Sequence, residues 1–147
     1  MIEQSILTTF ASNFVAYYKA HSSHWNTTGR NFYSDHKLLE AIYDDLQDEI
    51  DTLAEVIRTL EITVPNSLNE LLTLSNVSDM SIIDPTDGDE LLDLAQQDLE
   101  RLVTDYQDLE LTAKDLGHNH IANYSQDRVR DLEKWIWQLR STRVGRI

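Results

Sequence analysis

Two histidines and three carboxylates stand out in this chain because of their residue types and their spacing. They are His24, His36, Glu40, Asp51 and Glu55. Imidazole and carboxylate groups together suit hard or borderline cations, and Fe(II), Mn(II) and Zn(II) all fit such a set. Each residue taken alone fits a hydrogen-bond network or a solvated acidic edge just as well. Only the set as a whole predicts a metal site.

Four of the five residues lie in the segment 31–61, which contains no Pro or Gly and repeats apolar residues with helical periodicity. At 100° per residue, the four side chains fall within about 100° of one another around the helix and form one stripe. His36 and Asp51 are fifteen residues apart. A rise of 1.5 Å per residue therefore separates them by about 22 Å, and they cannot bind one ion within one chain.

His24 precedes a tight turn and His36 follows it, so the two imidazoles flank one crevice. One chain thus supplies a half-site with His24, His36 and Glu40, and a distant half-site with Asp51 and Glu55. A twofold axis that sets these helices of two chains antiparallel would bring each half-site against its complement. If all five residues are ligands, the spacing predicts two equivalent metal sites in a dimer, each shared between both chains.

Four long helices must position these residues. The first carries apolar residues up to His24 and should end near residues 27–30, and the second spans about 31–61. The third should begin after residues 84–87 and reach about 115, and the fourth should span about 120–141. Between the second and third, about twenty residues include a capping box at Ser67, which predicts a short helix. The sequence therefore predicts an all-α, ferritin-like four-helix bundle with a short extra helix in its long crossover.

Composition limits the class of protein. A length of 147 residues fits a single domain, 1–147. No apolar run approaches the roughly 18 residues that a membrane-spanning helix needs, and the first residues lack the pattern of a signal peptide. We therefore expect a cytoplasmic protein with no membrane partner. The net charge of -14 favours cations over nucleic acid as ligands.

The spacing of the candidate ligands also resembles a known family motif. The matching residues are His24-Trp25-Asn26, Gly29, Phe32, His36, Glu40 and Tyr43, followed by Asp51 and Ala54-Glu55. This pattern is similar to the ferroxidase motif of the Dps family, the mini-ferritins named as DNA-binding proteins from starved cells. The likeness extends through the crossover helix to Glu133, Lys134, Trp137 and Leu139 in the last helix.

The resemblance implies a function. It suggests a hollow dodecamer built from dimers that oxidises Fe(II), with hydrogen peroxide as the preferred oxidant, and stores ferric mineral for oxidative-stress protection. The catalytic ligands would be His24 and His36 from one subunit with Asp51 and Glu55 from the other, and Glu40 would be a further ligand. Each shared site would hold at most two iron ions. Trp25 and Tyr43 would lie beside the ligands as electron donors, although core packing also explains Tyr43.

Two departures from the family concern charged groups. Val56 stands where the family commonly has Arg after the second-helix Glu, and the chain has no basic residue before Lys19, which predicts that the lysine-rich arm is missing. An arginine tail (Arg140, Arg143 and Arg146) could replace that arm, although the net charge predicts weak DNA binding.

Two alternatives to a Dps-type ferroxidase remain open. A structural, DNA-binding oligomer with little ferroxidase activity is the first. A larger ferritin or a bacterioferritin is the second, and the chain lacks the Glu-x-x-His motif that such proteins place within one bundle.

Overall fold

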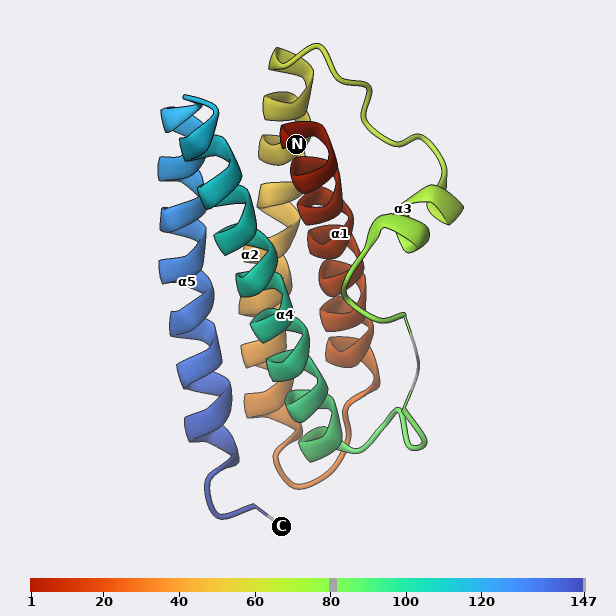
Figure 1. The fold of residues 1–147 in the computed structure, drawn as a ribbon. Coiled ribbons are helices and arrows are strands. Elements are labelled where there is room, and N and C mark those ends of the chain that lie inside the picture. The colour runs from red at the N-terminus through yellow and green to blue at the C-terminus, as the bar shows by residue number, and fades with distance from the viewer. Residues whose placement is uncertain (80–81, 147) are drawn as a thin grey trace.

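The computed structural model describes residues 1–79 and 82–146, and within them the chain forms four long helices and one short helix (Figure 1). The helices are α1 (Ile2–Asn26), α2 (Phe32–Thr59), α3 (Leu68–Leu74), α4 (Gly88–Asp115) and α5 (Asn119–Arg143). The predicted all-α bundle with a short helix in the crossover is confirmed. None of the helices in the described part is long and apolar enough to span a bilayer.

Local chemistry explains where the helices begin and end. Ser67 caps α3 through its hydroxyl, which accepts a hydrogen bond from the backbone amide of Glu70. The second helix ends at Thr59, two residues before the predicted end, because Glu61 adopts a φ of 61° that a helix cannot continue. Gly117, with a φ of 82°, forms the turn between α4 and α5 as a residue without a Cβ readily can.

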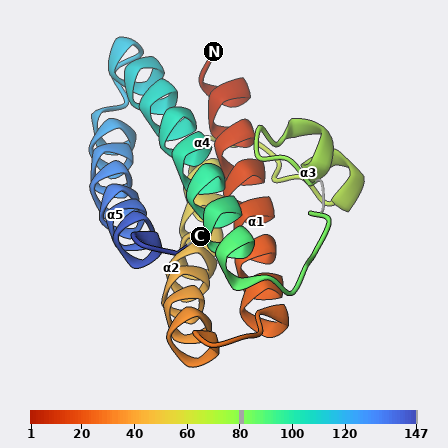
Figure 2. The same cartoon turned by 90° about the horizontal axis from the view of Figure 1, so that it is seen from below.

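The connections set the directions of the helices. Tight turns make α1 and α2 antiparallel, and likewise α4 and α5, while the crossover runs back along the bundle so that α4 lies parallel to α2 (Figure 1). The turn between α1 and α2, the start of α4 and the residues after α5 consequently meet at the lower end of the bundle in Figure 1. Figure 2 views that end directly.

Apolar side chains from every helix fill the space between them. The fully buried members include Ile6 on α1, Leu39, Leu46 and Leu53 on α2, Leu99 and Tyr106 on α4, and Leu132 and Leu139 on α5. Successive buried residues on the long helices, such as Leu39, Ile42 and Leu46 on α2, are three or four positions apart, which is the pattern that places one stripe in a core. Burial of this stripe fixes which face of α2 turns outward, and that face carries the candidate ligands.

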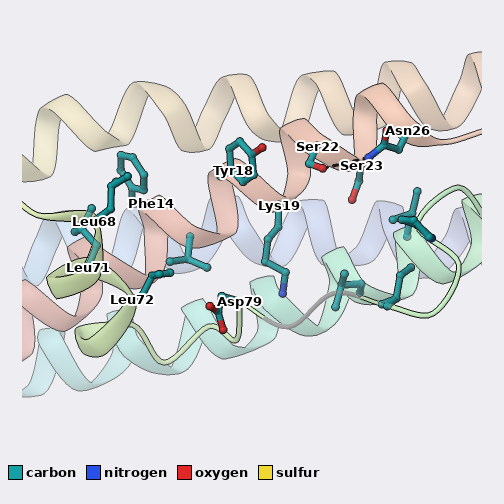
Figure 3. A pocket seen from close by; sticks show the side chains of 15 residues that line it. Phe14, Tyr18, Lys19, Ser22, Ser23, Asn26, Leu68, Leu71, Leu72 and Asp79 are labelled. Carbon is teal, nitrogen blue, oxygen red and sulfur yellow. Dashed lines mark hydrogen bonds between the residues drawn. The ribbon is translucent and has the colours of Figure 1, made fainter.

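A groove of about 460 Å³ separates α1 from α3 and the crossover (Figure 3). Lys19 lies on its wall and donates to the Ser78 carbonyl at 2.6 Å and to the Asp98 carboxylate at 3.0 Å, so it joins α1, the crossover and α4. Burial raises the pKa of Asp98 to about 6, although the Lys19 ammonium acts in the opposite direction.

This raised pKa predicts how stability depends on pH. Asp98 has an ordinary pKa of 3.8, so between about pH 4 and pH 6 the folded chain holds its proton more firmly than the unfolded chain. The contribution of Asp98 to the free energy of unfolding should therefore be full below pH 4 and fall as pH rises through 6. Denaturant unfolding at constant protein concentration should show this slope in the wild type and lack it in Asp98→Asn. A difference between the two proteins that stays constant with pH would contradict the assignment.

Candidate metal centre

The turn between α1 and α2 brings His24 and His36 face to face. Their rings stack with centroids 3.8 Å apart, and Nδ1 of each ring lies 2.8 Å from the backbone carbonyl oxygen of the other residue. Because a carbonyl oxygen only accepts hydrogen bonds, each Nδ1 carries the proton and each Nε2 keeps its lone pair. Reciprocal bonds of this kind fix both the tautomer and the orientation that a metal ligand needs.

Glu40 completes a group of three. It lies one turn after His36 on α2, and one ligand atom from each of His24, His36 and Glu40 falls within 4.8 Å of the other two. The described residues contain no other group of three metal-binding side chains this close together. His24 is buried and the other two are half-buried, so the group opens to the surface on one side. Lys37, 3.5 Å from the Glu40 carboxylate, supplies a nearby positive charge.

Aromatic rings border this group. Tyr43 stacks on His21 with centroids 3.8 Å apart, and its ring lies 5.1 Å from the ring of His24. On the other side of His21 lies Trp25, which is 58% exposed. The Tyr17 hydroxyl lies 2.9 Å from Nδ1 of His21. His21 is thus held by packing and a hydrogen bond, and burial together with the neighbouring His24 lowers its pKa.

The other two predicted ligands, Asp51 and Glu55, lie further along α2 and are exposed. The structure does not bring them near His24 or His36, because a straight helix of 28 residues keeps its two ends apart. Within one chain the five residues therefore form two separate halves, as their spacing predicts. The half with Asp51 and Glu55 has only two carboxylates and needs ligands from elsewhere to bind a cation tightly.

A polar network inside the bundle was not predicted from the sequence. Arg128 on α5 is 3% exposed and binds both carboxylate oxygens of Asp45 at 3.1 Å. Trp135 donates to the same carboxylate at 2.8 Å, and Tyr124 donates to Glu49 at 2.5 Å. Arg128 belongs to the basic cluster near the end of the sequence. It also lies four residues from both Tyr124 and Leu132 in the inward stripe of α5, and this spacing could have predicted that its side chain is buried.

The arginine tail also binds within the chain. Arg143 lies 3.3 Å from Asp89 and 3.0 Å from Asp93 on α4, and Arg146 pairs with Asp35 on α2. Arg140 is exposed. Two of the three arginines that the sequence offers for DNA are therefore already neutralised by carboxylates of their own chain.

Comparison with known proteins agrees with this architecture. Residues 4–144 match the family model described as a ferritin-like domain. The DNA protection during starvation protein of Helicobacter pylori is 30% identical over 129 residues, which cover 88% of this chain and 89% of that protein. The crystal structure of antigen TpF1 from Treponema pallidum has a TM-score of 0.89 at 29% identity, covering 96% of this chain and 90% of that one.

A Dps protein from Vibrio cholerae O1 also superimposes closely, with a TM-score of 0.89 at 26% identity over 95% of this chain and 87% of that one. It is described as a member of a broad superfamily of ferritin-like diiron-carboxylate proteins. The bundle, the crossover helix and the family match define the class of this chain as a ferritin-like protein. Within that class, the chain belongs to the Dps family.

Proposed function

We propose that this protein is an iron-storage ferroxidase whose sites are shared between two subunits. Each site would combine His24, His36 and Glu40 of one chain with Asp51 and Glu55 of the partner subunit, and would take Fe(II) as its substrate. The hollow dodecamer expected for the family would store the ferric product. The excess of acidic over basic residues, 26 against 12, supports the attraction of Fe(II) to such a shell.

One observation carries this proposal. The Nδ1 hydrogen bonds of His24 and His36 leave both Nε2 lone pairs free, and one ligand atom of each ring lies within 4.8 Å of Glu40, yet the remaining carboxylates lie far away on the same helix. Two imidazoles and one carboxylate leave coordination positions of a cation unfilled. An antiparallel partner helix would supply the missing carboxylates by symmetry.

The ligand types suit the proposed chemistry. Neutral imidazole binds Fe(II), while carboxylates stabilise the higher charge of Fe(III) once the electron has left. With hydrogen peroxide as oxidant, two Fe(II) ions, one peroxide and two protons give two Fe(III) ions and two water molecules. A two-electron reduction of this kind releases no hydroxyl radical. Two iron ions, the most that each site is expected to hold, supply the two electrons.

The test is an anaerobic Fe(II) titration followed by hydrogen peroxide, with ferric absorbance as the readout. We expect His36→Ala and Asp51→Ala each to lower the initial rate at least 10-fold, since loss of a ligand removes the bound substrate. Gln107→Ala, which alters an exposed residue on α4 and leaves α2 unchanged, serves as the control and should oxidise iron like the wild type. Wild-type rates in both ligand variants would show that the proposed site is wrong.

A further inference from the structure

The segment after α5 folds back beneath the end of the bundle that holds His24 and His36 (Figure 2). We propose that Arg146 in this segment clamps Asp35 and thereby positions His36 in the metal centre. The inference rests on the proposed function, because Arg146 and Asp35 would position a ligand of that same metal centre.

The clamp is a bidentate ion pair between the buried Asp35 and Arg146, whose side chain is 18% exposed. The two terminal nitrogens of Arg146 lie 3.0 and 2.9 Å from the two carboxylate oxygens of Asp35. Asp35 is 1% exposed, although a lone buried carboxylate is costly to keep charged. Parallel hydrogen bonds from a planar guanidinium give the strongest and most directional pairing available to a carboxylate. The position of Asp35 is therefore tied to the segment that carries Arg146.

Local hydrogen bonds from Phe32 to Gly29 and from Asp35 to Asn31 hold the first turn of α2, and the Arg146–Asp35 pair ties that turn to the segment after α5. Asn31 occupies the N-cap position but makes no side-chain capping hydrogen bond. The wall opposite Arg146 is the start of α4, where Gly88 leaves room for the carboxylate. A Cβ at Gly88 would lie 2.7 Å from Oδ2 of Asp35 and 3.0 Å from Oγ1 of Thr27. The Asp35 carboxylate is thus enclosed between Gly88 of α4 and the guanidinium of Arg146.

His36 follows Asp35 directly in α2, so a movement of the Asp35 backbone also moves His36. The carbonyl of His36 accepts from Nδ1 of His24, and Nδ1 of His36 donates to the carbonyl of His24, so the stacked pair relies on the backbone of both residues. A shift of the first turn of α2 would break both bonds together. It would also release the tautomers that leave both Nε2 atoms free to bind a metal.

Loss of Arg146 would leave the buried Asp35 carboxylate without its cationic partner. The carboxylate would then move toward water, and the first turn of α2 would move with it. Residues that orient a metal ligand typically change metal affinity by roughly 10- to 100-fold when they are removed. We expect a loss of this size in the affinity of the Arg146 variant for Co(II), which replaces Fe(II) and is not oxidised during the titration. The visible absorption spectrum of the bound Co(II) should change as well.

The experiment compares Arg146→Met, Arg146→Lys and Arg143→Met in the full chain. Arg143 is the matched control, since its ion pairs go to Asp89 and Asp93 on α4 and not to α2. Arg146→Met should show the loss of Co(II) affinity, Arg146→Lys should recover part of it, and Arg143→Met should bind like the wild type. Wild-type affinity and spectrum in Arg146→Met would overturn the proposal.

A double variant, Asp35→Val with Arg146→Met, separates positioning from general stability. It contains no stranded charge, so its thermal stability should exceed that of Arg146→Met, while its Co(II) affinity stays low because the clamp is missing. Full recovery of affinity along with stability would overturn the proposal. If the wild type bound Co(II) but oxidised no Fe(II), the proposed function would fail, and these comparisons would still decide whether the clamp positions His36.

Discussion

An equal mixture of His36→Ala and Asp51→Ala subunits is expected to regain about one quarter of the wild-type rate of Fe(II) oxidation, although each variant alone should be at least 10-fold slower than the wild type. In a mixed dimer, one site receives both substitutions and the other receives neither. Random pairing makes half of the dimers mixed, and half of the sites in those dimers are intact. Subunits must be unfolded and refolded together, or expressed together, so that the chains can exchange before the stopped-flow measurement.

The matched control is a mixture of His24→Ala and His36→Ala. Both substitutions fall in the same half-site, so every site in every dimer lacks one histidine and no activity should return. Recovery in this control, or no recovery in the first mixture, would contradict a site shared between two chains. A site within one chain would give no recovery in either mixture.

The second large effect concerns the polar network inside the bundle. Arg128→Met should lower the free energy of unfolding by about 3 kcal/mol, because removing the cation of a buried ion pair leaves its carboxylates with only their neutral hydrogen-bond donors. The stranded groups would be Asp45 and Glu49, whose side chains are 22% and 18% exposed. This partial contact with water places the effect at the lower end of the range of about 3–5 kcal/mol for buried pairs.

Arg130→Met is the matched control on the same helix. The Arg130 side chain is 73% exposed and pairs with Asp127 and Asp131 at 3.5 Å, so its loss should cost less than about 1 kcal/mol. Denaturant unfolding should be measured at one protein concentration, because association of subunits adds to apparent stability. Equal effects of the two substitutions would mean that the buried network contributes nothing beyond a surface ion pair.

The sequence alone was sufficient to predict the helices and their order. Apolar residues every three or four positions, together with Gly117 and the capping box at Ser67, reflect interactions within a few residues of one another. The separation of the two half-sites also followed from the sequence, since a straight helix without Pro or Gly has a fixed rise per residue, and the distance between two residues follows from their numbers. His36 and Asp51 could be placed on one stripe and declared too far apart without any structure.

Only the tertiary structure revealed how charge is paired over long separations in the chain. Arg128 and Arg146 appear in the sequence as part of one basic cluster, but they bind Asp45 and Asp35, which lie 83 and 111 residues away. The reciprocal bonds that orient His24 and His36 likewise depend on how the turn between α1 and α2 closes. Periodicity predicts which face of a helix is buried. Which partner meets a polar group on that face depends on the packing of all the helices together.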